Sequence, residues 1–127
     1  MQIERELLKG VIPLAVLKIL KRRAMYGYEL VAEVAKRSDG VLKLGQSTLY
    51  PLLYNLEAQG LIKGEWQSSD AGRDRKYYSL TEDGLKRLER DMVQWEALVR
   101  GMGQLVLETA RTYAGAGARG TLAWVLA

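Results

Sequence analysis

Histidine and cysteine are both absent from the 127 residues of this chain. Their absence excludes zinc sites built on imidazole or thiolate, iron–sulfur clusters, disulfides and catalytic triads with a histidine base. We therefore expect no metal and no cofactor. The sequence also argues against an enzyme, because acid–base chemistry would be left to carboxylates that stand where helix caps and solvated faces place them.

Long hydrophobic runs are lacking as well. The longest, from Val11 to Leu17, has seven residues and contains Pro13, whereas about 20 apolar residues are needed to cross a bilayer. The first residues do not have the charged and then apolar build of a signal peptide. With 48% hydrophobic and 27% charged residues, the composition is that of a globular domain. We expect a cytoplasmic protein that does not bind membranes.

The net charge of +4 is small but unevenly distributed. Residues 1–60 carry nine Lys and Arg against six Asp and Glu, and residues 61–80 carry four against three. Residues 81–127 are neutral, with six of each sign. The first two thirds of the chain therefore suit a polyanionic partner, and the last third suits a protein partner.

Apolar residues at three- and four-residue spacings predict three helices in the first half of the chain. The first covers residues 4–22, with a kink or a late start near Pro13. The second covers residues 27–40 and ends in Asp-Gly, and the third covers residues 47–60. Pro51 is expected in or next to the first turn of the third helix, where few backbone donors have helical partners. The core-facing stripe of that helix consists of Leu49, Leu52, Leu53 and Leu56.

The periodicity then changes. Residues 62–67 and 75–80 predict two strands, joined into a hairpin by a polar turn at residues 68–72. Thr81 is a good N-cap for a long final helix, whose apolar residues repeat at alternating spacings of three and four. The resulting heptad seam consists of Leu85, Leu88, Met92, Trp95, Val99, Met102 and Val106.

This order of elements predicts a fold that is mainly α with a small β-hairpin. We expect a winged helix-turn-helix DNA-binding domain over residues 1–81, a C-terminal dimerisation helix over 82–113 and a flexible tail over 114–127. The seam would pair two copies into a homodimer. Its recognition helices would then lie about 34 Å apart, which implies a palindromic operator. The alternative is that the seam packs on the first helix of its own protomer.

The third helix is the candidate for entry into the major groove of double-stranded DNA. Hydroxyl and amide groups near a helix N-terminus suit both phosphate oxygens and base edges. The hairpin tip adds cations that would lie along the DNA backbone or minor groove. The predicted DNA-binding residues are Gln46, Ser47, Thr48, Tyr50, Pro51, Tyr54, Asn55, Arg73, Arg75 and Lys76. The alternative for each is an ordinary solvent-exposed side chain.

Four motifs follow one another between residues 25 and 81, within a resemblance that covers residue 5 to about residue 110. They are Met25-Tyr-Gly-Tyr-Glu29, Ser47-Thr-Leu-Tyr-Pro-Leu-Leu53, Leu56-Glu-Ala-Gln-Gly-Leu-Ile62 and Gly72-Arg-Asp-Arg-Lys-Tyr-Tyr-Ser-Leu-Thr81. In this order and at these separations they resemble the PadR family of bacterial transcriptional regulators. The resemblance implies a homodimeric winged-helix repressor that is released by a small effector. The short C-terminal region is similar to that of the compact subgroup with a single C-terminal dimerisation helix.

The resemblance also assigns positions and shows one departure. Tyr26 and Tyr28 match the aromatics that open the second helix, which adds Tyr26 to the implied DNA-binding residues. Tyr54 and Asn55 occupy positions that are commonly basic in the family. Two phosphate contacts would therefore be missing, and we expect a shallower dependence of DNA affinity on salt than a basic pair would give.

Trp95 stands in the middle of the seam, where leucine or isoleucine would be ordinary. Facing its own copy across a two-fold axis, a pair of indoles could hold a flat aromatic or cationic effector. Met92, Val99, Leu8 and Ile12 complete this hypothetical effector site. The alternative is that Trp95 simply packs in the dimer. For the whole chain, the competing function is a winged-helix protein-interaction module without specific DNA binding.

Overall fold

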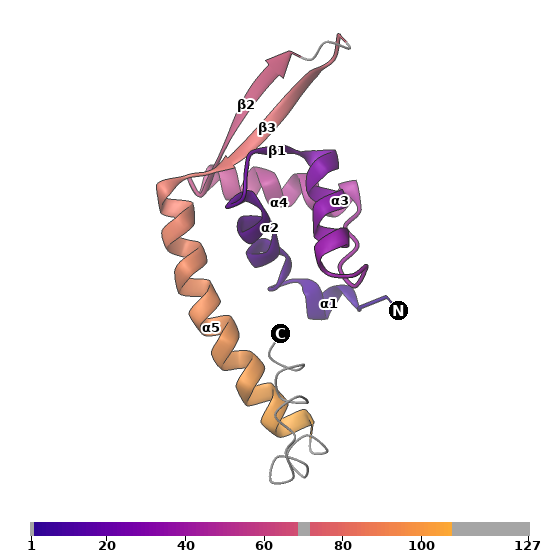
Figure 1. The fold of residues 1–127 in the computed structure, drawn as a ribbon, viewed down its shortest axis with the longest axis vertical. Helices are drawn as coiled ribbons and strands as arrows, with labels where there is room; N and C mark the ends of the chain where they lie inside the picture. Colours follow the sequence, from indigo (N-terminus) through magenta and orange to yellow (C-terminus); the bar gives the residue numbers. More distant parts are fainter. Residues whose placement is uncertain (1, 69–71, 108–127) are drawn as a thin grey trace. The chain divides into compact units, whose positions relative to one another are not determined.

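The computed structural model describes residues 2–68 and 72–107. Its elements are α1 (Arg5–Leu8), α2 (Ile12–Leu20), β1 (Met25–Tyr26), α3 (Gly27–Arg37), α4 (Gln46–Ala58), β2 (Ile62–Ser68), β3 (Asp74–Leu80) and α5 (Glu82–Val106) (Figure 1). The predicted fold class, mainly α with a small β-hairpin, is confirmed. The predicted tail over 114–127 and the end of the predicted dimerisation helix lie outside the described residues.

The chain divides into two compact units. Residues 1–88 form the first, which we call the winged-helix unit, and the chain from Glu89 onward forms the second. The first turns of α5 therefore belong to the winged-helix unit, whereas the predicted domain boundary lay between residues 81 and 82. The described residues of the second unit, 89–107, are called the α5 extension below.

The predicted helix over residues 4–22 is in fact two helices. In one continuous helix the Lys9 carbonyl would accept a hydrogen bond from the backbone N–H of residue 13, and Pro13 has none. The chain turns instead, with the Val11 N–H donating to the Leu8 carbonyl at 2.9 Å. Pro13 then occupies the first turn of α2, where a missing N–H is tolerated.

The core of the winged-helix unit is apolar throughout. The structure buries sixteen hydrophobic side chains among the residues it describes, all between Ile12 and Leu88, and no polar or charged side chain among them. From α4 it takes Leu49, Leu53 and Leu56. Leu52, which the spacing placed on the same stripe, is half-buried. A helix face is about 100° wide, and Leu52 stands at its border.

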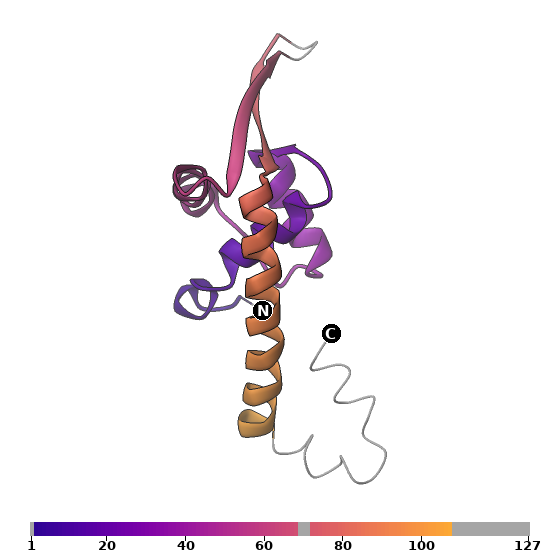
Figure 2. The ribbon, with the colours of Figure 1, turned by 90° about the vertical axis from the view of Figure 1, so that its left-hand side faces the viewer.

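The three strands form one antiparallel sheet in the order β1-β3-β2. The long ladder pairs Ile62 with Leu80 at its base and Ser68 with Asp74 near its tip. Figure 2 shows this hairpin projecting beyond α2, α3 and α4 as a wing. Strand β1, only two residues long, pairs with β3 and was not predicted, because two residues carry no periodicity.

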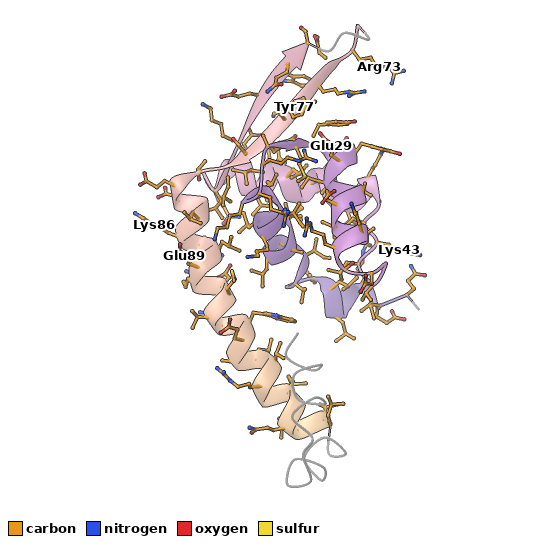
Figure 3. The ribbon with its side chains drawn as sticks, in the orientation of Figure 1. Glu29, Lys43, Arg73, Tyr77, Lys86 and Glu89 are labelled. Atoms are coloured by element: carbon orange, nitrogen blue, oxygen red, sulfur yellow. The ribbon has the colours of Figure 1, made fainter. Side chains whose placement is uncertain are left out.

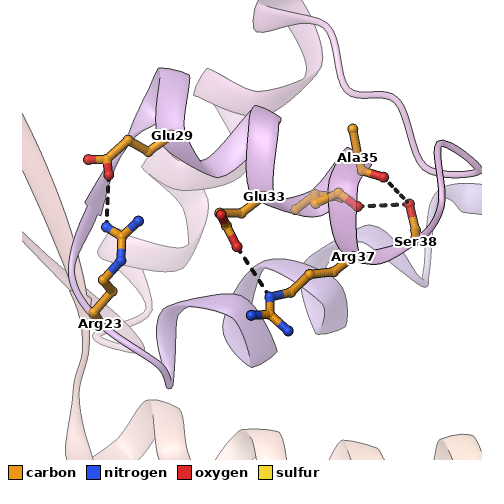
Figure 4. Close-up of polar contacts among 7 residues, drawn as sticks. Arg23, Glu29, Glu33, Ala35, Arg37 and Ser38 are labelled. Carbon is orange, nitrogen blue, oxygen red and sulfur yellow. Dashed lines mark hydrogen bonds and ion pairs between the residues drawn. The ribbon is translucent and has the colours of Figure 1, made fainter.

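The turn between α3 and α4 is fixed by Ser38. Its hydroxyl donates to the Val34 carbonyl at 2.7 Å (Figure 4). The same oxygen accepts the Leu42 N–H at 2.9 Å. Asp39 and Gly40 then adopt left-handed backbone angles, with φ of 53° and 79°. Aspartate and glycine tolerate that region better than other residues. The predicted helix stop at Asp-Gly is thus confirmed.

Helix α4 begins earlier than predicted. Its first residue is Gln46, so Pro51 lies inside the helix rather than in its first turn. The Ser47 carbonyl consequently lacks its helical donor.

On another side of α4, Tyr50 lies close to the first residue of α3. A methyl group at Gly27 would lie 2.8 Å from Tyr50 Oη. Glycine at position 27 permits this approach.

Helix α5 starts as predicted. Thr81 Oγ1 accepts the Gly84 N–H at 3.0 Å and donates to the Gly60 carbonyl at 2.7 Å, so the N-cap also ties α5 to the end of α4. Leu88, predicted at the dimer interface, is fully buried in the protomer and is a core residue instead.

Within the described part of the chain, no helix is long and apolar enough to span a membrane.

Candidate nucleic-acid interface

Helix α4 presents a polar and aromatic face to solvent. The predicted DNA-binding residues Ser47, Pro51 and Tyr54 are exposed on it, and so are Gln46 and Tyr50. The helix has no side-chain cap and no acidic residue in its first turn. Its first backbone N–H groups are therefore available to an anion, and the positive end of the helix dipole favours one. This geometry is suited to phosphate oxygens beside base edges.

A second stripe of α4 faces α1. Thr48, Leu52 and Asn55 line a cleft on this side, and Arg5 Nη2 donates a hydrogen bond to Thr48 Oγ1 at 3.3 Å. Thr48 and Asn55, both predicted to bind DNA, thus stand between the solvent face and α1. Arg5 was not among the predicted site residues. No sequence signal identified it, because residue 5 meets residue 48 only through the break between α1 and α2.

One face of the wing carries an aromatic cluster. The Arg75 guanidinium lies 4.5 Å from the centre of the Tyr26 ring, and the Tyr77 ring meets Tyr26 edge-on at 5.4 Å. Tyr28, largely exposed, stacks on Tyr26 with the two ring centres 6.5 Å apart. The cation–π contact holds Arg75 in one orientation. Tyr26 is therefore a half-buried support for Arg75 as well as a predicted DNA contact.

The other face of the wing is tied to α4. Lys76 Nζ donates to Glu57 Oε1 at 3.0 Å, and the Gly64 N–H donates to Glu57 Oε2 at 3.2 Å. The hydrogen bond to Glu57 raises the pKa of Lys76, which keeps this amine charged. Lys76, predicted as a phosphate contact, thus also fixes the wing against α4 through Glu57, and its contact with DNA stays a prediction.

Trp66 is a second residue that the sequence interpretation missed. It pairs across the strands with Lys76 and is 69% exposed. The alternation of strand side chains puts it on the same face as Lys76, the face that is tied to α4. The strand register could have revealed this position, since the hairpin fixes which residue stands opposite which.

Arg73 stands at the end of the wing, beyond Tyr77 (Figure 3). It is exposed, immediately before β3. The winged-helix unit as a whole carries 15 basic and 11 acidic side chains, whereas the α5 extension carries two and three. The positive excess of the described residues therefore belongs to the unit that holds α4 and the wing.

The α5 extension exposes apolar side chains. Val93, Leu98 and Leu105 are more than half exposed, and Trp95 and Met102 are more than a third exposed. Met92 and Val99 of the predicted seam are half-buried, and Val106 is exposed. Of the predicted effector site, Leu8 and Ile12 line the cleft beside α4, whereas Met92, Trp95 and Val99 belong to the second unit.

The fold and this surface define a winged-helix DNA-binding protein: α3 and α4 form the helix-turn-helix and β2–β3 the wing. Comparison with known proteins identifies the family of winged-helix proteins to which the chain belongs. Residues 16–90, more than half of the chain, match the model of the transcriptional regulator PadR-like family. The chain belongs to that family, as the four sequence motifs indicated. It is a DNA-binding transcriptional regulator and not an enzyme.

Individual relatives agree. The transcriptional regulator Rv3488 of Mycobacterium tuberculosis is 31% identical over 96 residues, which cover 76% of this chain and 86% of that protein. A solved PadR family transcriptional regulator from Eggerthella lenta has a TM-score of 0.70 at 39% identity, covering 80% of this chain and 86% of that one. A transcriptional regulator from Clostridium thermocellum has a TM-score of 0.74 at 25% identity, covering 80% and 98%.

Proposed function

We propose that the protein is a repressor that binds a palindromic operator as a homodimer. In each protomer the exposed face of α4 enters a major groove, while Arg73 and Arg75 of the wing contact the DNA backbone. The observation that carries this proposal is the pairing of an uncapped, acid-free α4 N-terminus with a wing whose Arg75 is held by Tyr26.

The apolar face of the α5 extension supports the homodimer. A helix that leaves Leu98, Met102 and Leu105 exposed in the protomer needs a partner for these side chains. A second copy offers the same face, and a two-fold axis matches it to itself. Two symmetric recognition helices then require two symmetric half-sites, which is why the operator is expected to be palindromic.

The test is a binding titration on DNA from upstream of the protein's own gene at several salt concentrations. Each phosphate contact contributes about 0.9 to the slope of log affinity against log salt. We expect Arg73→Ala and Arg75→Ala each to lower that slope by roughly this amount. Lys86→Ala, which removes an exposed cation on α5, is the control and should leave the slope unchanged (Figure 3).

An unchanged slope in both wing variants would remove the wing from the interface. The competing function, a protein-interaction module, would be supported if the wild type showed no salt-sensitive, sequence-dependent DNA binding. To separate repressor from activator, a reporter behind the same upstream region is measured with and without the protein, and we expect lower expression with it.

We also retain the prediction that Trp95 contacts a flat aromatic or cationic effector in the dimer. It is 39% exposed in the protomer, which leaves part of the indole available for stacking. A variant with Trp66→Phe and Trp124→Phe keeps Trp95 as its sole tryptophan. Planar cationic dyes should quench its emission in a saturable way. Emission that does not respond would assign Trp95 to simple dimer packing.

A further inference from the structure

From Tyr77 toward its tip, the wing consists of two strands only. Strand β1 pairs with β3 at Tyr77 and Tyr78 and then ends, whereas β2 and β3 stay paired out to Ser68 and Asp74. A two-stranded ribbon without a third strand or a packed helix is only marginally stable by itself. The direction in which the wing points is therefore set by contacts near its base.

Two neighbouring residues of β3 hold this base from opposite sides. Side chains alternate along a strand, so Arg75 and Lys76 point to opposite faces of the wing. On one face Arg75 packs on the Tyr26 ring, and on the other face Lys76 Nζ donates to Glu57 Oε1 of α4. Arg73 lies further toward the tip (Figure 3). The position of its charge thus depends on these two contacts.

The Glu57 carboxylate joins α4 to both strands of the wing. One oxygen accepts a hydrogen bond from Lys76 of β3, and the other accepts the Gly64 N–H of β2 at 3.2 Å. Strand β2 is an edge of the sheet, so N–H groups on its outer side have no partner strand. Hydrogen bonds to an ionised acceptor are roughly twice as strong as neutral ones. One carboxylate therefore sets the angle between the recognition helix and the wing.

Gly64 makes room for this contact. A methyl group at position 64 would collide with Lys76 Cε and would lie 3.1 Å from Glu57 Oε2. Both atoms belong to flexible side chains, so a larger residue would push these side chains apart rather than distort the strand. The absence of a side chain at position 64 lets Lys76 reach α4 across β2.

We propose that Glu57 is a positioning residue for DNA binding, because it fixes the wing at the angle at which the wing and α4 reach the same duplex. This role rests on the proposed function, in which Arg73 and Arg75 contact the DNA backbone. Along an extended strand, Arg73 lies about 10 Å from Lys76. If the wing rotated by about 20° at its base, Arg73 would move by about 3.5 Å, which is enough to break a hydrogen bond to a phosphate.

The sign of the effect separates this role from simple electrostatics. A carboxylate in the DNA-binding unit repels phosphates, so its removal alone should raise the affinity for DNA. A positioning role predicts that removal of the Glu57 charge lowers the affinity. Glu33 supplies the matched control, because it accepts a hydrogen bond from Arg37 Nε at 3.2 Å and this pair joins two residues of the same helix, α3 (Figure 4).

The first experiment measures operator affinity at several salt concentrations. Glu57→Gln and Gly64→Ala should each bind about tenfold more weakly, with the slope of log affinity against log salt lowered by about 0.9 or more. Gly64→Ala changes no charge, so its loss would come from the displaced Lys76 side chain. Glu33→Gln should bind as tightly as the wild type or slightly more tightly. Thermal melts check that all three variants fold.

A double-mutant cycle with Arg73→Ala gives the sharpest readout. In the wild type this substitution should lower the slope by about 0.9, and after Glu57→Gln by less than about 0.3, because Arg73 has then already lost its phosphate. A decrease of about 0.9 in both backgrounds would show that Arg73 reaches DNA without Glu57. This outcome, wild-type affinity in Glu57→Gln, or an equal loss in Glu33→Gln would each overturn the positioning role.

The second experiment needs no DNA. Backbone amide relaxation, measured by NMR on the full-length protein, gives order parameters for residues 73–76 of the wing. We expect about 0.85 in the wild type and less than about 0.6 in Glu57→Gln and Gly64→Ala, with α3 unchanged. Order parameters that stay at the wild-type level would overturn the contact as a support of the wing.

The two experiments also separate this role from the proposed function. If the wild type binds no operator, the proposed function fails together with the positioning role, and the relaxation data still decide whether Glu57 holds the wing. If the order parameters fall while operator affinity stays at the wild-type level, Glu57 supports the wing without positioning it for DNA, and the positioning role is overturned.

Discussion

The winged-helix unit and the α5 extension differ in whether their apolar side chains are buried within the protomer. The first buries sixteen of them, whereas the extension buries none among its described residues. The first also carries the positive charge, and the extension is nearly neutral. Amphipathic periodicity is present in both regions, so a periodic stripe alone does not reveal whether it is satisfied inside the protomer or needs a partner.

The strongest test of this difference is a charge on the exposed stripe of the extension. Leu98 is 54% exposed, so Leu98→Glu should leave the protomer folded. In a dimer it would bury an unpaired carboxylate, and we expect the dimer dissociation constant to rise about 100-fold or more. Sedimentation equilibrium measures this. Gln104→Glu adds the same charge at an exposed position about 120° around the helix from Leu98 and serves as the control. An equally strong dimer in both variants would exclude this stripe from the interface.

A substitution at Gly84, in the first turn of α5, is instead expected to destabilise the protomer itself. A methyl group there would lie 2.0 Å from the Leu61 carbonyl oxygen and 2.7 Å from Leu80 Cδ1. Because a backbone carbonyl cannot move aside easily, Gly84→Ala should destabilise the unit by about 1–3 kcal/mol, as overpacking does. Chemical unfolding gives the value. Gly10→Ala, where a methyl group meets nothing within 4 Å, is the control and should be nearly neutral.

Ser38 tests how firmly the winged-helix unit holds the turn before α4. Ser38→Ala leaves the Leu42 N–H without its acceptor in a partly buried place, and we expect a loss of about 1 kcal/mol. Ser47→Ala, on the exposed face of α4, should change stability by less than about 0.5 kcal/mol. Chemical unfolding curves of both variants measure these losses in the free energy of unfolding. Equal losses would mean that the Ser38 hydrogen bonds do not stabilise the turn more than an exposed serine does.

The smallest effect is expected at Gly101 in the extension. A methyl group there would meet nothing within 4 Å in the protomer. Gly101→Ala should therefore stabilise the helix by up to about 1 kcal/mol, seen as higher helix content and a higher melting temperature. If the substitution instead weakens the dimer in sedimentation experiments, Gly101 serves a close approach between two copies, and the two regions differ in this respect too.

Sequence periodicity predicted the long elements well and their junctions less well. The spans of α3, the wing strands and the start of α5 follow from apolar spacing, an Asp-Gly stop and a threonine cap. For the region around Pro13, the sequence left open a kink or a late helix start, and the structure has two separate helices, α1 and α2. Strand β1 was missed, and Leu52 was assigned to the core although it borders a cleft. These errors lie where two elements meet.

The functional residues also divide into those that the sequence predicted and those that only the tertiary structure revealed. The sequence by itself determined the family, the exposed face of α4 and the cations of the wing, because these follow from motifs and from local helical or strand geometry. Only the tertiary structure decided that Glu57 engages Lys76, that Tyr26 supports Arg75 and that Arg5 reaches Thr48. The reason is physical: such pairs join residues far apart in the chain, and their distances depend on how whole elements pack.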